Sequence, residues 1–321
     1  MERRLAPLAA PLASVIHIAI LAAVGLLAFF VRVFSVIKYE SIIHEFDPWF
    51  NFRASQFLLA HGRREFAVWF DTDAWYPLGR LVGTTVFPGL MYTTVVLERL
   101  LRALRLPVDI RHICVFTAPV FSVVSAVGTY LMAWEVCGDR GAGLLSALFM
   151  AVAPSYLSRS VAGSFDNEAI AITLLLMTLY LFLKAMHRSS ILWSTVCGLT
   201  FGYLVSSWGG YHFVVLFIPT FVLSMIVVQR FDAPLYIAYN VFYAVGTFCA
   251  MQTRSVELQA LRASEHLPSH VAFLATQAMM VYEYLRARLS PAQMRFALRR
   301  GLAAAAALGF AGTAFIRTED G

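Results

Sequence analysis

Long apolar runs separated by short polar segments dominate the sequence. The first run covers about residues 12–31, and further runs follow from residue 113. A stretch of about 20 apolar residues is long enough to cross the hydrocarbon core of a bilayer as a helix. The pattern therefore predicts an all-α polytopic membrane protein. Eight later spans are expected at about residues 113–136, 142–156, 169–186, 191–206, 211–228, 235–251, 270–285 and 302–316.

The segment between the first two predicted spans has a different character. Residues 38–112 are mixed in charge and rich in aromatic residues and Arg, which predicts a long external loop. Within it, residues 82–97 are apolar but short and contain Pro88 and Gly89, so we expect a helix at the membrane surface. The predicted organisation is a cytosolic N-terminus with the first span (1–37), the first lumenal loop (38–112) and a transmembrane helical bundle (113–321).

Composition narrows the class of protein. Hydrophobic residues make up 60% of the chain and charged residues 14%, and the mean hydropathy is +0.70, which excludes a soluble domain. The net charge of +6 comes almost wholly from Arg. In a membrane protein such charge reports loop orientation and lipid contact, so we expect no nucleic-acid partner. The four Cys residues lie in or beside apolar runs, without metal or disulfide spacing, and are interpreted as packing residues.

Basic residues orient the predicted spans. With a cytosolic N-terminus, Lys184, Arg230 and Arg286 all fall on the cytosolic side, as the positive-inside rule requires. Two spans then separate Asp47 from Asp166, which places both acids on the lumenal face. If residues 82–97 crossed the membrane, the two acids would lie on opposite faces and could share no site.

A polar stretch interrupts the apolar pattern at residues 159–170, which read Arg-Ser-Val-Ala-Gly-Ser-Phe-Asp-Asn-Glu-Ala-Ile. Ionised carboxylates beside a bilayer core are costly, so Asp166 and Glu168 are candidates for a functional site. If the chain is extended until about Glu168, both carboxylates can face one cation, because residues i and i+2 share a side of an extended chain. A helix should follow from residue 169. The alternative is that the polar residues only cap this helix.

Asp47 is a third candidate, because Pro48 favours an extended backbone before it and so restricts where its carboxylate points. Three carboxylates without a His or Cys partner suit Mg²⁺ or Mn²⁺. Such an ion at a membrane surface suits a lipid substrate that carries phosphate or diphosphate, where it stabilises the leaving group. Arg159 could contact the same phosphate. The alternative is that its side chain only extends to place the guanidinium at the membrane–water interface.

Four stretches carry a resemblance to a known family. They are Glu-Phe-Asp-Pro-Trp-Phe-Asn at 45–51, Trp-Tyr-Pro-Leu-Gly-Arg at 75–80, the acidic motif at 158–168 and Ser-Trp-Gly-Gly-Tyr at 207–211. The chain resembles the catalytic subunit of eukaryotic oligosaccharyltransferase, a GT-C type membrane glycosyltransferase of the endoplasmic reticulum. That family transfers a preassembled oligosaccharide from dolichyl diphosphate to the Asn side chain of Asn-x-Ser/Thr sequons.

The resemblance implies a role for each candidate residue. Asp47 would be a metal ligand that also meets the acceptor asparagine, and Arg159 would be important for catalysis. Asp166 and Glu168 would be further ligands of Mn²⁺ or Mg²⁺. The remaining implied substrate-binding residues are Trp208 and Tyr211. The implied partners are the dolichyl diphosphate oligosaccharide, a nascent sequon-bearing polypeptide and other oligosaccharyltransferase subunits.

Two departures from the family pattern are visible. Phe52 and Phe165 stand where the family usually has Tyr, which leaves the carboxylates intact. The resemblance runs from the first span to about Arg300, whereas the family continues with a Ser-Val-Ser-Glu loop, further spans and a lumenal Trp-Trp-Asp-Tyr-Gly domain. We therefore expect the N-terminal portion only, which could be inactive alone. Glu265 is not expected to stand in for the missing loop glutamate.

Three alternatives remain from other classes. One is another GT-C transferase that uses a lipid-linked sugar, such as a protein O-mannosyltransferase, although the motifs at 164–168 and 208–211 argue against it. The second is a truncated, non-catalytic subunit of the oligosaccharyltransferase complex. The third is a transporter, for which charges near mid-span would be expected; here the acids lie at the ends of spans.

Overall fold

Long apolar helices account for most of the fold, which a computed structural model describes for residues 2–297 and 299–300. Of the described helices, five are long and apolar enough to cross a membrane. These five correspond to the C-terminal part of α1 (Glu2–Tyr39), α5 (Ile110–Cys137), α8 (Glu168–Arg188), η1 with α10 (Gly209–Tyr211 and His212–Val227) and α11 (Ala233–Met251).

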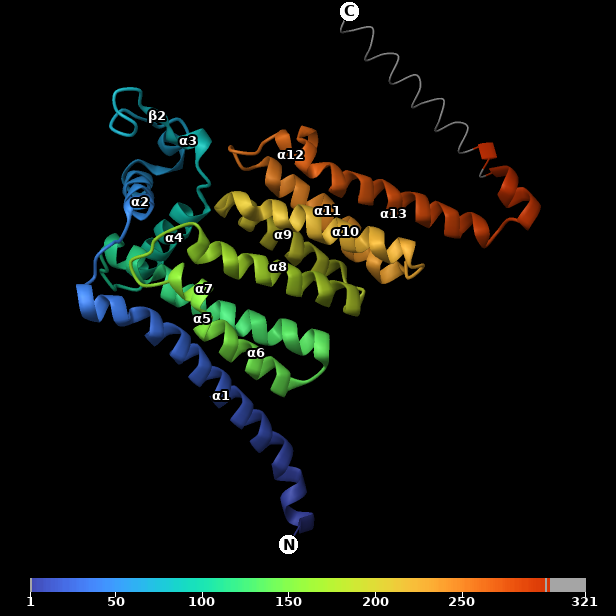
Figure 1. The fold of residues 1–321 in the computed structure, drawn as a ribbon, viewed down its shortest axis with the longest axis horizontal. Helices are drawn as coiled ribbons and strands as arrows, with labels where there is room; N and C mark the ends of the chain where they lie inside the picture. The colour runs from blue at the N-terminus through green and yellow to red at the C-terminus, as the bar shows by residue number, and fades with distance from the viewer. Residues whose placement is uncertain (1, 298, 301–321) are drawn as a thin grey trace, which may run out of the picture.

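The bundle is a row of neighbouring helices (Figure 1). In this row α6 (Arg140–Val152) packs on α5, α5 on α8, α8 on α9 (Ile191–Ser207), and α9 on α11. Helix α1 crosses α5 and α6 on one side, and α13 (Leu267–Arg286) packs against α10 on the other. The short α12 (Gln259–Arg262) and η2 (Ser264–His266) connect α11 to α13.

Aromatic rings fill the contact between α8, α9 and α11. The ring of Phe242 lies 5.3 Å from that of Phe201 and 5.9 Å from that of Phe182, and all three side chains are buried. Edge-on and tilted contacts of this kind add to the stabilisation from burial alone. They hold α8, α9 and α11 together within the bundle.

The segment between α1 and α5 forms its own small unit at one end of the bundle. It consists of α2 (Phe46–Phe66), β1 (Phe70–Asp71) paired antiparallel with β2 (Arg80–Leu81), α3 (Val82–Thr85) and α4 (Gly89–Ala103). Arg53 on α2 donates to Asp71 and Asp73, each at 2.8 Å. These bonds fasten the β1–β2 hairpin to α2, and Asp71 is buried beneath them.

The single helix predicted over residues 82–97 is wrong, because two helices occupy this region. Val86 is extended (φ −101°, ψ 158°) and Pro88 stands immediately before α4. Proline has no N–H to continue α3 but is well suited to the start of a new helix. Gly89 then packs so closely on the end of α9 that a Cβ would lie 2.2 Å from Ser207 Oγ.

The predicted span at 142–156 is also interrupted. Helix α6 ends at Val152, and a separate turn, α7 (Pro154–Ser158), follows. The residue before a proline avoids the helical region, and Ala153 accordingly adopts φ −57° and ψ 120°. Helix α6 alone therefore spans only ~20 Å. Helix α13 matches the span predicted at 270–285 but is not among the five, and the span predicted at 302–316 lies outside the described residues.

Candidate functional site: the acidic loop and the first turn of α2

Residues 159–167 form an irregular loop between α7 and α8, called here the acidic loop. Backbone hydrogen bonds of 3.0 Å anchor it from three sides. Ala162 N–H donates to Arg32 O on α1, Gly163 N–H donates to Val115 O on α5, and His44 N–H donates to Gly163 O. The acidic loop is thus fixed by segments far away in sequence, including the one that leads into α2.

Gly163 is needed for this close approach. Its φ is +94°, and a Cβ there would lie 2.4 Å from Ile42 O and 2.5 Å from His44 Cδ2. The positive φ and the lack of space both disfavour any larger side chain, which would fit only if residues 42–44 moved away. This glycine therefore lets the segment before α2 lie directly on the acidic loop.

Arg32, directly after the first apolar run, is a fully buried cation in α1. Its Nε donates to Ser160 Oγ at 2.7 Å, and one terminal nitrogen donates to Ala28 O and Ala151 O, both at 2.8 Å. The guanidinium also lies 4.7 Å from the centroid of the Tyr156 ring. Arg32 thereby ties α1 and α6 to the start of the acidic loop. The signal that could have found it is a basic residue inside an apolar run.

Asp47 lies in the first turn of α2, so the prediction that its backbone is extended is wrong. The helix begins at Phe46, and the non-helical residue is Glu45 (φ 66°, ψ 167°). Pro48 falls in the first turn, where its missing N–H needs no partner in the helix. The Asp47 side chain is exposed to solvent at this helix start.

Asn51 connects α2 to the acidic loop. Its Nδ2 donates to Phe165 O at 3.1 Å and lies 3.5 Å from Asp166 Oδ1. Asp47 precedes Asn51 by one helical turn and so shares its face of α2. The prediction that Asp47 and Asp166 lie at the same end of the bundle is therefore confirmed. Asn51 ends the motif at 45–51, but the sequence alone predicts no role for it.

The acids of the loop are in different environments. Asp166 Oδ1 accepts from Asn167 N–H at 2.7 Å. Glu168, the first residue of α8, has Oε2 at 3.5 Å from Arg159 Nε, a long ion pair in which the Arg159 side chain is 59% exposed and that of Glu168 24%. Asn167 is the N-cap, but its side chain makes no capping bond. A purely capping role for these polar side chains is thus not supported.

The donor atoms of the acidic loop suit a hard divalent cation. Asn167 Oδ1 and Glu168 Oε2 are buried without a hydrogen-bond partner, and oxygen atoms of this kind are the ligands that Mg²⁺ and Mn²⁺ prefer. Within the described residues, however, no three His, Cys, Asp or Glu side chains lie close enough to hold an ion together. Asp166 and Glu168 are adjacent, while Asp47 does not complete a three-carboxylate group with them.

Trp208 and Tyr211 lie in the turn between α9 and α10. The Trp208 ring covers Gly210, and the Tyr211 hydroxyl lies 3.2 Å from His266 Nε2. The Tyr211 ring also stacks on His212, with centroids 4.1 Å apart. Trp208 and Tyr211 therefore contact other residues than the acids do. No direct contact joins this turn to Asp47, Asp166 or Glu168 within the described residues.

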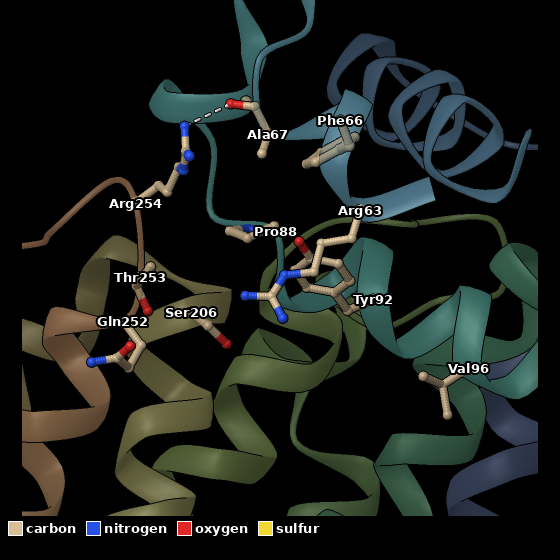
Figure 2. A pocket seen from close by; sticks show the side chains of 11 residues that line it. Arg63, Phe66, Ala67, Pro88, Tyr92, Val96, Ser206, Gln252, Thr253 and Arg254 are labelled. Atoms are coloured by element: carbon tan, nitrogen blue, oxygen red, sulfur yellow. Dashed lines mark hydrogen bonds between the residues drawn. The ribbon is translucent and has the colours of Figure 1, made fainter. Parts of the chain in front are cut away.

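A cavity of about 360 Å³ lies at the far end of α2 (Figure 2). Arg63 extends beside Tyr92, and Arg254 donates to Ala67 O at 3.1 Å across the cavity mouth. At about 1.5 Å per residue, the helix places the C-terminal end of α2 roughly 20 Å from Asp47 in its first turn. The cavity is therefore separate from the acidic loop.

Comparisons with known proteins match the chain along almost its whole length. The sequence model described as "Oligosaccharyl transferase STT3, N-terminal" matches residues 15–317. The chain belongs to this family. Subunit STT3B of the dolichyl-diphosphooligosaccharide–protein glycosyltransferase of Oryza sativa subsp. japonica is 46% identical over 279 residues, which are 87% of this chain and 39% of the relative. Subunit stt3 of Schizosaccharomyces pombe is 47% identical over 271 residues, 84% of this chain and 36% of the relative.

Solved structures support the fold class. The archaeal oligosaccharyltransferase AglB from Archaeoglobus fulgidus, in complex with an inhibitory peptide and a dolichol-phosphate, superposes with a TM-score of 0.69 at 20% identity. The match covers 92% of this chain and 37% of AglB. The predicted all-α polytopic fold of GT-C type is thereby confirmed. The chain spans less than two fifths of the length of these STT3 relatives and of AglB, and it corresponds to their N-terminal portion.

Proposed function

We propose that this chain carries part of the active site for transferring an oligosaccharide from dolichyl diphosphate to the Asn side chain of Asn-x-Ser/Thr sequons. Membership of the STT3 family supports this proposal, as do the glycosyltransferase names of its relatives. The observation that carries it is the bond from Asn51 to the acidic loop, because that bond sets the first turn of α2 beside Asp166.

Each acidic or basic group has a distinct part in the proposed reaction. The amide nitrogen of an acceptor asparagine is a poor nucleophile, because its lone pair is delocalised into the carbonyl. The exposed Asp47 carboxylate accepts a hydrogen bond from that amide and helps to orient it. Arg159, also exposed, faces the phosphate of the donor. The C–N bond then forms at the anomeric carbon, with inversion, as the C–O bond to the phosphate breaks and dolichyl diphosphate leaves. The Asp47 carboxylate takes the proton that the amide nitrogen loses.

Asp166 and Glu168 are the proposed ligands of Mn²⁺ or Mg²⁺. Asp47 does not complete a group of three carboxylates with them, and its proposed role is the contact with the acceptor amide. Glu168 Oε2 supports this assignment, because it is buried, accepts no hydrogen bond and has only the long ion pair with Arg159. A bound divalent cation would supply stabilisation of the negative charge on the departing diphosphate. Asn51 helps to hold Asp166 in place. Trp208 and Tyr211 are proposed to line the substrate path at the neighbouring turn.

The proposed setting is the membrane of the endoplasmic reticulum, with the acidic loop on the lumenal side. The proposed partners are the dolichyl diphosphate oligosaccharide, the sequon-bearing polypeptide and other oligosaccharyltransferase subunits. The distribution of Lys and Arg between alternate loops supports this orientation.

The decisive experiment measures glycosylation of a fluorescent sequon peptide by membranes in which the complete gene product replaces the host STT3 subunit. We expect transfer with Mn²⁺, loss of transfer with EDTA, and at least a ~100-fold loss for Asp47→Ala or Asp166→Ala. A peptide with Gln in place of the acceptor Asn is the control. Retained transfer in both alanine variants would overturn the assignment. Mn²⁺ binding, followed by electron paramagnetic resonance, tests the ligands independently of activity.

A further inference from the structure

A pocket of about 340 Å³ opens at the end of the bundle opposite the acidic loop. Its lining residues are Leu131, Trp134, Glu135, Gly138, Tyr180, Lys184 and Arg188. They come from the C-terminal ends of α5 and α8, at the side where α5 turns into α6 (Figure 1). Helix α8 begins at Glu168, and its 21 residues rise by ~30 Å, the thickness of a bilayer core. The pocket therefore lies at the other membrane surface.

Lys184 is held in position without a carboxylate partner. Its Nζ donates to Tyr180 Oη at 2.6 Å and lies 4.1 Å from the centroid of the Trp193 ring. The side chain is half-buried, and Arg188 stands one helical turn further on. Within the part of the chain that the structure describes, no ion pair involves either residue. The positioned Lys184 and the exposed Arg188 beside it favour an anionic group such as a phosphate on this wall of the pocket.

Glu135 introduces a negative charge on the facing wall. Its Oε1 lies 2.8 Å from His187 Nδ1, and its side chain is 22% exposed. The nearest other acid, Asp139, uses both carboxylate oxygens to accept from Gly141 and Ala142 N–H, at 3.0 and 2.9 Å. Glu135 is thus the acid that can face a ligand. A carboxylate opposite two cations disfavours a multiply charged anion and favours a zwitterion.

Aromatic rings surround the pocket at the depth of lipid headgroups. Trp134 and Tyr180 line it, and the Arg140 guanidinium lies 4.9 Å from the centroid of the Trp134 ring. Trp and Tyr collect where the headgroups of a bilayer lie. Leu131 supplies an apolar part of the wall.

We propose that this pocket binds the headgroup of an ethanolamine phospholipid. Lys184 and Arg188 hold the phosphodiester, and Glu135 receives the ammonium group of the ethanolamine. The lipid would brace the ends of α5 and α8, one membrane thickness away from the acidic loop.

Native mass spectrometry of the detergent-purified full chain tests this proposal with added phosphatidylethanolamine, phosphatidylglycerol or soluble phosphoethanolamine. The wild type should bind phosphatidylethanolamine best, and soluble phosphoethanolamine should not displace it. The double variant Lys184→Gln/Arg188→Gln should bind on the order of 30-fold more weakly, because each basic residue near a lipid surface contributes about fivefold. Glu135→Gln should lose the preference for phosphatidylethanolamine over phosphatidylglycerol.

Two further variants make the result interpretable. Arg230→Gln removes an exposed cation from the turn between α10 and α11, outside the pocket, and should bind like the wild type. Lys184→Arg keeps the charge and should retain most of the binding. Equal binding by the wild type and the double variant would overturn the proposal. So would tighter binding of phosphatidylglycerol, displacement by soluble phosphoethanolamine, or an equal loss in Arg230→Gln.

Discussion

Arg32 on α1 donates from Nε to Ser160 Oγ at 2.7 Å, across 128 residues of sequence. The bond joins the first membrane span to the loop that carries Asp166. A buried cation without a carboxylate beside it is costly unless its N–H groups are satisfied. Here carbonyl and hydroxyl oxygens satisfy most of them, although one terminal nitrogen of Arg32 has no partner.

Replacing Arg32 should destabilise the protein through the partners that it leaves behind. Arg32→Met removes donors from two buried carbonyls and from Ser160, and we expect a loss of about 3 kcal/mol in the free energy of unfolding. Denaturant titration in detergent measures this. Arg230→Met, at an exposed turn, is the control and should change stability by less than ~0.5 kcal/mol. Similar stabilities for both variants would contradict the anchoring role.

Gly163→Ala should cost more than an ordinary substitution at positive φ. Gly138 offers a matched control, since its φ is +71° but a Cβ there would meet nothing within 4 Å. Gly138→Ala therefore measures only the cost of placing an alanine at positive φ, about 1 kcal/mol of the free energy of unfolding. Gly163→Ala adds the clash with Ile42 O and His44, so we expect about 3 kcal/mol and impaired transfer. Unfolding temperatures of the two variants test this difference, and equal shifts would show that the loop has room.

Asn51→Asp should impair the proposed reaction more than it impairs folding. The variant removes the N–H donors to Phe165 O and Asp166 and sets a second carboxylate against Asp166. We expect at least a ~10-fold loss of peptide glycosylation, with a stability loss of about 1 kcal/mol. Gln56→Glu adds the same charge at an exposed position of α2 and serves as the control. Full activity of Asn51→Asp would show that Asn51 does not position Asp166.

His266 should make stability depend on pH. Burial lowers its pKa to about 4, and the nearby His212 and His270 add to this effect, while Glu265 opposes it. The folded state keeps His266 neutral, whereas the unfolded state binds a proton near pH 6.5. Stability should therefore be constant above about pH 7 and fall between about pH 6.5 and 4, by at most roughly 3 kcal/mol. His266→Gln should flatten the profile measured by thermal unfolding, and an unchanged profile would exclude His266 as its source.

The sequence predicts the elements of this fold better than the contacts between them. Apolar runs give the positions of the helices, and counting spans places Asp47 and Asp166 at the same end. The break before α4 does not follow from the apolar pattern. Pro88 is compatible with a single surface helix over residues 82–97, but in the structure it stands directly before a new helix. The extended backbone predicted for Asp47 was wrong because the fixed φ and missing N–H of Pro48 suit the first turn of a helix, and this outweighs the bias against a helical residue before a proline.

The partners that anchor the acidic loop could not be predicted from local pattern, although Arg32 itself stands out as a basic residue in an apolar run. Arg32, Gly163 and Asn51 act through backbone carbonyls and N–H groups of distant segments, and such partners leave no trace in the spacing of side chains. The carboxylates were found because their charge contrasts with apolar surroundings. The metal ion, the lumenal orientation and the roles of Trp208 and Tyr211 stay predictions.

The three-sided anchoring of the acidic loop also bears on the order in which the protein is made. Its partners on α1, in the segment before α2 and on α5 all precede it in the chain. Once α8 has left the ribosome and entered the bilayer, every group that fixes Asp166 is already present. The catalytic half of the proposed site can thus be complete while α9 and the later helices are still being synthesised.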